Sequence, residues 1–190
     1  RTWQNCPQEG SSIKTEIHGR PALLRSISSV YVLFFFLALS FLIYYPALDG
    51  EFLWDDDNHV LAVYDMNNFE GLKKIWFEPG TFNQYYPLTY SSFWLENKIW
   101  NLEPRGYHAL NIVLHALNAF LLFLTIRHLG ISGSFWISLI FLIHPLQVES
   151  VAWITERKNV LSGLFYFGAL LFYFRFSKLL VSSDSGLIKS

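Results

Sequence analysis

The stretch SSVYVLFFFLALSFLIYYPAL, residues 28–48, decides the architecture of this protein. It contains no charged residue, and a helix of about 20 apolar residues crosses the roughly 30 Å hydrocarbon core of a bilayer. A cleavable signal peptide is the competing interpretation because basic residues precede the run. The apolar part of a signal peptide is usually only about 7–15 residues long, however. We therefore predict an uncleaved membrane span.

The composition also favours a membrane protein. Of the 190 residues, 52% are apolar, 18% aromatic and 15% charged, whereas soluble domains carry about 25% charged residues. The net charge of −1 gives no reason to expect a nucleic-acid partner. Cys6 is the one cysteine, so neither an internal disulfide nor a cysteine-based metal site is expected. The first residue is Arg1, which suggests a fragment of a longer protein.

Three further apolar runs follow, and with the first they predict an all-α membrane protein built as a polytopic helical bundle. The predicted parts are a cytoplasmic tail (1–27), a transmembrane region (28–176) with spans at 28–48, 107–126, 135–151 and 160–175, an outer loop (49–106), and a polar tail (177–190). Basic residues concentrate on the inner side of a bilayer. The basic residues that set this orientation are Lys14, Arg20, Arg25, Arg127, Arg175 and Lys178.

Two amphipathic helices are predicted inside the outer loop. The first carries Phe69, Leu72, Ile75 and Trp76 at helical spacing, and Pro79-Gly80 ends it. The second carries Leu88, Leu95 and Ile99 and ends before Pro104. Such helices either lie flat in the membrane interface or pack on each other, and the sequence leaves both arrangements open.

An acidic triplet, Asp55-Asp56-Asp57, follows Trp54 directly after the first span. Because one Asp at the centre of a membrane helix costs roughly 2.5–3.5 kcal/mol, the triplet must lie at or beyond the membrane surface. Neighbouring carboxylates raise one another's pKa, which suits a general base, and carboxylate oxygens also bind divalent cations. The alternative is a helix cap or a solvated acidic turn.

A polar stripe is predicted on the second span. His108, Asn111, His115 and Asn118 are spaced i, i+3, i+7 and i+10 and therefore share one narrow sector of a helix. Polar groups in membrane helices face the protein interior or a water-filled cavity. Packing and hydrogen bonding are favoured over metal binding. His108 is nearest the outer surface and is the one best placed to reach a substrate.

The segment after the third span begins with His144-Pro145, where the proline is expected to break the helix. It continues through Glu149 and Glu156 to Arg157 and Lys158. These two cations can face the acidic triplet across a cleft and bind a phosphate, the arginine through two parallel hydrogen bonds. The alternative is ordinary anchoring of Arg157 and Lys158 in the interface.

These motifs occur in a recognisable order. They are 50-GEFLWDDD-57, 84-QYYPLT-89, 106-GYHALN-111, 115-HALN-118, 144-HPLQVESVAW-153 and 157-RKNVL-161. In this order, from about Gly50 to Phe174, they resemble the N-terminal membrane region of the transmembrane and tetratricopeptide-repeat O-mannosyltransferases and their bacterial relatives. These enzymes are members of the GT-C superfamily of membrane glycosyltransferases.

The resemblance implies transfer of a sugar, expected to be mannose, from a polyprenyl-phosphate donor to an acceptor hydroxyl on the outer side. The acceptor is expected to be a protein or another lipid-linked molecule. Carried over by motif, Asp55 is the general base and Asp56 orients it, the acceptor or a cation. The expected donor-phosphate and substrate-binding residues are Arg157, Lys158, His108 and Glu149.

The resemblance implies no certain cofactor and leaves open a divalent cation held by Asp55, Asp56 and Asp57. The expected location is the bacterial inner membrane rather than the endoplasmic reticulum. Tyr86 departs from the animal members, which commonly have Arg at that position. A fragment with four spans and no tetratricopeptide repeats is expected to be inactive by itself.

Two other functions compete with the transferase. A non-catalytic membrane anchor or assembly module of the same fold is disfavoured because Asp55 is present. A transporter would be expected to place ionisable residues near the bilayer midplane and often to show inverted repeats. Here the acidic triplet lies at the surface and the sequence shows no repeat.

Overall fold

The computed structural model describes residues 22–187, apart from the side chains of 22–28, 57 and 179–187. Within that range the chain forms helices and turns and no strand, which confirms the all-α class. The elements are α1 (Ala22–Ile43), η1 (Tyr45–Asp49), η2 (Asp57–Leu61), α2 (Ala62–Tyr64), α3 (Phe69–Phe77), α4 (Pro87–Trp100), α5 (Pro104–His128), α6 (Ser134–Ile143), α7 (Gln147–Ala152) and α8 (Arg157–Leu187).

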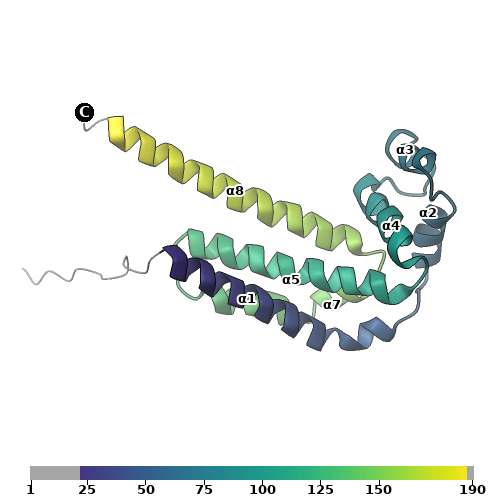
Figure 1. The fold of residues 1–190 in the computed structure, drawn as a ribbon, viewed down its shortest axis with the longest axis horizontal. Helices are drawn as coiled ribbons and strands as arrows, with labels where there is room; N and C mark the ends of the chain where they lie inside the picture. The colour runs from purple at the N-terminus through teal and green to yellow at the C-terminus, as the bar shows by residue number, and fades with distance from the viewer. Residues whose placement is uncertain (1–21, 188–190) are drawn as a thin grey trace, which may run out of the picture.

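The long helices form a bundle, and the predicted outer loop forms a small helical unit at one end of it (Figure 1). Helix α5 is central and contacts α1, α6 and α8. We call η2, α2, α3 and α4, residues 57–100, the outer cap. The far ends of α5 and α8 point away from the cap, so the bundle has one capped end and one uncapped end.

A side-chain cap and prolines set the starts of α3, α4 and α5. The Asn68 side chain accepts a hydrogen bond from Gly71 N (2.6 Å) and so caps α3, which ends at Phe77, before Pro79. Helices α4 and α5 each start with a proline, Pro87 and Pro104, whose missing N–H is no loss in the first turn. Both predicted cap helices are therefore present.

Helices α3 and α4 pack on each other, one of the two arrangements that the sequence left open. Trp76 Nε1 donates to Ser91 Oγ (2.9 Å), and Tyr85 Oη donates to Trp76 O (2.8 Å). The predicted stripe of α4 does not form its buried face. The stripe residues Leu88, Leu95 and Ile99 are exposed, whereas α4 buries Thr89, Tyr90, Phe93, Glu96 and Asn97.

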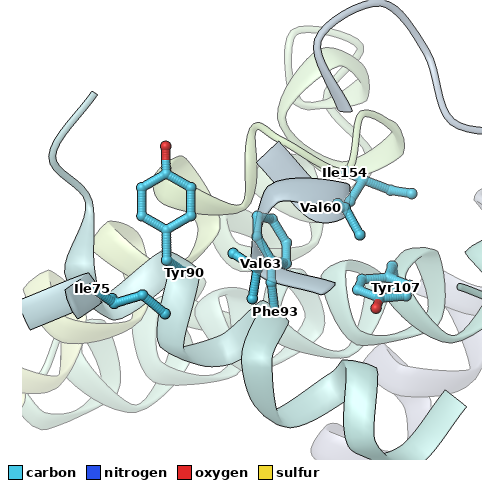
Figure 2. Close-up of a cluster of buried hydrophobic side chains, with 7 residues drawn as sticks. All are labelled: Val60, Val63, Ile75, Tyr90, Phe93, Tyr107 and Ile154. Carbon is cyan, nitrogen blue, oxygen red and sulfur yellow. The ribbon is translucent and has the colours of Figure 1, made fainter. Parts of the chain in front are cut away.

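The outer cap shares its hydrophobic core with the bundle (Figure 2). Tyr90 and Phe93 of α4 lie in this core with Tyr107 of α5, and Phe93 and Tyr107 have ring centroids 6.1 Å apart. The remaining buried members are Val60, Val63, Ile75 and Ile154. Because one core contains residues from both parts, the cap is held in a fixed position on the bundle.

The polar stripe of α5 is buried and serves helix packing, as favoured from the sequence. Three of its side chains bond to backbone carbonyls of the neighbouring segments, which satisfies polar groups that lipid cannot. These bonds are Asn111 Nδ2 to Trp153 O (3.0 Å), His115 Nε2 to Leu142 O (3.0 Å) and Asn118 Nδ2 to Val160 O (2.9 Å).

Some observed boundaries differ from the predicted ones. The run 135–151 is divided, because the backbone is extended at His144, before Pro145, and helix resumes only at Gln147. Helix α8 continues past the predicted end at Arg175 to Leu187, in a stretch without proline. Residues 1–21 of the predicted N-terminal tail and 188–190 of the C-terminal tail lie outside the described residues.

Two of the described helices are long and apolar enough to cross a membrane, at Pro104–His128 and Arg157–Lys178. The apolar parts of α1 (Ser29–Ile43) and α6 (Ser134–Ile143) are shorter. The core helix of a soluble protein meets the same criteria of length and composition. The number of membrane spans therefore stays a prediction.

Helices α5 and α8 approach closely at Gly163. A Cβ atom at this position would lie 2.9 Å from Asn118 Nδ2, whereas a Cβ at Gly168 would meet nothing within 4 Å. We expect Gly163→Leu to lower the free energy of unfolding in mixed micelles by about 1–3 kcal/mol through overpacking. The matched control Gly168→Leu should not. Equal effects of the two variants would contradict the close contact.

Candidate active site at the junction of the outer cap and the bundle

The acidic triplet lies where the chain passes from α1 and η1 into the outer cap. Trp54, directly before it, has φ +53° and is 86% exposed. A bulky residue in the left-handed region is uncommon, and such strain clusters at functional sites. The Trp54 ring meets the Trp153 ring edge-on, with centroids 5.6 Å apart. The backbone strain marks the position next to Asp55 as a candidate for function.

Asp56 is fully buried and anchors this loop. Its Oδ2 accepts from Leu53 N (3.0 Å), and its Oδ1 accepts from Thr155 N (2.8 Å) and from the Thr155 hydroxyl. Because both oxygens are engaged, Asp56 is not open to an acceptor or a cation. Asp56 joins the triplet loop to the segment between α7 and α8, which is compatible with one of its predicted roles, the orientation of Asp55; that role stays a prediction.

Asp55 differs from Asp56 in its exposure to solvent. Its side chain is 49% exposed, and its Oδ2 lies 3.6 Å from His59 Nε2. Its other oxygen, Oδ1, is covered and makes no hydrogen bond to the described residues. An uncompensated carboxylate oxygen costs free energy, which is typical of a group kept for function. Of the two predicted catalytic acids, Asp55 is the accessible one, and its catalytic role stays a prediction.

A cation site at the triplet gains no support from the surroundings. The Asp57 side chain is outside the described part, and Asp56 spends both oxygens on hydrogen bonds. Among the residues described, no three His, Cys, Asp or Glu side chains gather as metal ligands. The divalent cation remains a prediction.

Arg157 is fully buried at the start of α8, a position that does not fit its predicted role as a phosphate ligand. A guanidinium has five N–H donors, and all five are used inside the protein. Nη1 and Nη2 donate to the two carboxylate oxygens of Glu96 (2.6 and 3.1 Å). The remaining donors reach Asn111 Oδ1, Ser92 Oγ (3.3 Å) and Tyr107 O (2.9 Å). Arg157 therefore clamps α4, α5 and α8 together.

Lys158, the next residue, is the cation that stays accessible. Its side chain is 27% exposed, pairs with Glu156 (2.7 Å), and places its ammonium 5.8 Å from the centroid of the Tyr86 ring. It lines a cavity of about 470 Å³ between the start of α4 and the start of α8. The other lining residues are Tyr85, Tyr86, Pro87, Leu88, Thr89, Asn159, Leu161, Ser162 and Phe165.

The other two predicted substrate residues lie apart from this cavity. His108 is 2% exposed, and a Cβ at Gly50 would lie 3.2 Å from its Nε2, so the ring packs under the start of the triplet loop. Its predicted contact with substrate does not fit this burial. Glu149 is exposed on α7. The structure thus separates the predicted set into buried supports and accessible groups.

Sequence reasoning missed several residues of the site, namely His59, Tyr90, Glu96 and Thr155. His59 follows Asp55 at i+4, a spacing that places two side chains on one helix face and was available as a signal. Glu96 and Thr155 carry no such signal, because their partners Arg157 and Asp56 are 61 and 99 residues away in the chain.

Burial shifts the titration of two of these groups. It raises the pKa of Tyr90 to about 12, with the charges of Tyr86 and Asp55 adding to the effect. It also raises the pKa of the Glu96 carboxyl, an effect that the Arg157 guanidinium opposes through its charge and its hydrogen bonds. Tyr90 consequently keeps its hydroxyl proton at physiological pH, and Glu96 depends on Arg157 to stay ionised.

Breaking the buried pair should be strongly destabilising. We expect Arg157→Leu to lower the free energy of unfolding by about 3–5 kcal/mol, because Glu96 is left buried without a partner. Arg157→Leu combined with Glu96→Leu should recover most of the loss. The control is Arg105→Leu, which removes an exposed pair with Asp49 of similar length (2.7 Å) and should change little.

The loss in Arg157→Leu should also depend on pH. An unpaired Glu96 has its folded-state pKa raised by burial, so the folded state binds its proton more tightly than the unfolded state does. The variant should therefore regain stability as pH falls from neutrality toward 4.5, the ordinary value for Glu. Unfolding at pH 8 and pH 5 measures this effect, and a loss that is the same at both would contradict it.

Comparison with known proteins finds relatives over about 70% of this chain. Protein O-mannosyl-transferase Tmtc1 of Drosophila melanogaster is 32% identical over 149 residues, which is 73% of this chain and 17% of that protein. Human TMTC3 is 31% identical over 143 residues (70% and 16%), and human TMTC2 is 30% identical over 152 residues (73% and 18%). No family model matches, and no solved structure does.

The chain spans less than a fifth of the length of these three relatives. All three are animal proteins, so the expected preference for the bacterial inner membrane is not supported. Their shared name matches the resemblance that the ordered motifs indicated. Over about 70% of its length the chain is homologous to the transmembrane and tetratricopeptide-repeat protein O-mannosyl-transferases.

Proposed function

We propose that this chain is the catalytic membrane region of a GT-C glycosyltransferase that moves a sugar, taken to be mannose, onto a protein hydroxyl. The donor in this proposal is a polyprenyl-phosphate sugar. The observation that carries it is the state of Asp55: a half-exposed carboxylate beside a strained residue, on a loop anchored by the buried Asp56. The names of the relatives support the same reaction class.

The proposed setting is a bilayer crossed by α1, α5, α8 and the segment α6–α7. Large apolar side chains on the outside of these helices support it, since lipid or further helices can cover them. Examples are Phe34, Leu42, Trp136, Ile140, Phe172 and Tyr173. Arg127, Arg175 and Lys178 lie toward the uncapped end. By the positive-inside rule these residues support a cytoplasmic uncapped end, so the outer cap is proposed to lie on the opposite, non-cytoplasmic side.

The proposed reaction is a displacement with inversion at the anomeric carbon. The Asp55 carboxylate takes the proton of the acceptor hydroxyl while the oxygen of that hydroxyl attacks the anomeric carbon. The bond from that carbon to the phosphate oxygen breaks, and the polyprenyl phosphate leaves with the electron pair. Asp56 takes no part in proton transfer and holds the loop that carries Asp55.

The cavity at Lys158 suits the phosphate end of such a donor. Its walls include the apolar side chains of Leu88, Leu161 and Phe165, and Lys158 supplies a positive charge. The ammonium now pairs with Glu156, so a bound phosphate would compete with that carboxylate. Stabilising charge that develops on the leaving phosphate is the kind of electrostatic assistance that accelerates group transfer.

Replacing the proposed base should abolish transfer. In full-length protein in membranes, with a radiolabelled polyprenyl-phosphate mannose and a protein acceptor, we expect Asp55→Asn to lower kcat by about 10²–10⁴-fold. The control Asp49→Asn removes a nearby exposed carboxylate and should leave kcat unchanged. Equal transfer by wild type and Asp55→Asn would remove Asp55 from the mechanism and favour a non-catalytic assembly role.

Replacing the proposed phosphate ligand should weaken donor binding. We expect Lys158→Met to raise the KM for the lipid-linked donor about tenfold, the size expected for one charge-assisted hydrogen bond. Lys73→Met is the matched control, because Lys73 also pairs with a glutamate at 2.7 Å but lies on α3. A donor KM that is unchanged in Lys158→Met would place the phosphate elsewhere.

A further inference from the structure

We propose that His59 and Tyr90 are positioning residues that act on the reaction through Asp55. The proposal rests on the proposed function of Asp55 as the base. Besides covering one end of the bundle, the outer cap supplies the two side chains that orient the Asp55 carboxylate.

The three side chains form a line from the cap core to the accessible carboxylate. Asp55 Oδ2 lies 3.6 Å from His59 Nε2, and on the far side of the ring His59 Nδ1 lies 2.7 Å from Tyr90 Oη. Asp55 and His59 come from successive turns, and His59 N donates to Asp55 O (3.1 Å). Tyr90 reaches the same point from α4, 31 residues later.

Burial increases along this line. Asp55 is about half exposed, His59 is 8% exposed and Tyr90 is 1% exposed. The Tyr90 ring is stacked on Phe82 with centroids 4.1 Å apart, and it lies nearly parallel to the His59 ring (19°). The inner end is therefore packed and shielded from water, while the outer end, Asp55, is accessible.

In this proposal the Tyr90 hydroxyl is the donor and His59 Nδ1 the acceptor of the hydrogen bond between them (2.7 Å). Tyr90 keeps its hydroxyl proton because burial raises its pKa to about 12, so it can donate to Nδ1. With Nδ1 as the acceptor, the ring directs an N–H at Nε2 toward Asp55. The separation of 3.6 Å between Nε2 and Oδ2 is longer than a hydrogen bond, and catalytic hydrogen bonds that are long in the free enzyme often shorten when substrate binds.

This arrangement matches a general pattern of catalysis, in which the acting group is oriented by a second group and that group by a third. Here the acting group is a carboxylate. An N–H directed at Oδ2 fixes the plane of the carboxylate. If His59 and Tyr90 were only part of the core, their rings alone would be sufficient.

Kinetics of full-length protein in membranes, with the donor and acceptor above, test the proposal. We expect His59→Phe, which keeps a ring, to lower kcat about tenfold with the donor KM within about twofold of wild type. His59→Gln, which restores an N–H donor, should recover most of the rate. Tyr90→Phe should lower kcat less, and adding it to His59→Phe should change nothing further, because Tyr90 acts through His59.

The outcomes separate this inference from the proposed function. A normal kcat in His59→Phe, alongside the loss in Asp55→Asn, would overturn the positioning role and leave the base intact. Multiplying effects of His59→Phe and Tyr90→Phe would also overturn it, since they would indicate independent structural roles. Normal transfer by Asp55→Asn would overturn both proposals.

A spectroscopic measurement tests the same geometry without activity. In full-length protein with ¹⁵N-labelled histidine, the His59 signals are those missing from His59→Phe. We expect an unprotonated Nδ1 in wild type and a shift of the proton between the two nitrogens in Tyr90→Phe. A protonated Nδ1 in wild type, or a spectrum unchanged in Tyr90→Phe, would overturn the assignment.

Discussion

The buried ion pair between Arg157 and Glu96 is the interaction on which the arrangement of this protein depends. It joins the start of α8 to α4, and the same guanidinium also bonds to Asn111 and to the backbone of Tyr107 on α5. A guanidinium buried without partners would cost several kcal/mol. The five hydrogen bonds remove that penalty only when all three helices are in place, so the outer cap and the bundle have one relative position.

A second anchor completes the site. Asp56 ties the triplet loop to Thr155, two residues before Arg157 in the chain. The segment 155–157 is therefore hydrogen-bonded to the triplet loop through Thr155 and to α4 through Arg157. Asp55 and Lys158 each lie beside one of these anchors, at the accessible edge. In both cases the buried residue and the accessible residue are neighbours in sequence: Asp56 follows Asp55, and Arg157 precedes Lys158.

Much of this organisation could be predicted from the sequence. Helical periodicity and proline positions gave α3, α4 and α5, because those signals are local. The spacing of Asn111, His115 and Asn118 gave a buried polar face, because a helix of 3.6 residues per turn puts them on one side. The ordered motifs indicated the relatives that the comparisons then found. These features depend on short stretches of chain.

The sequence by itself determined the all-helical class, the polar face of α5 and the position of the acidic triplet after the first apolar run. Only the tertiary structure decided which of two neighbouring carboxylates and which of two neighbouring cations are accessible. Asp55 and Asp56 are the same residue type side by side, and Arg157 and Lys158 carry the same charge. Their partners Glu96 and Thr155 come from distant segments. Burial of a charged group is decided by such partners, and a local pattern contains no information about them.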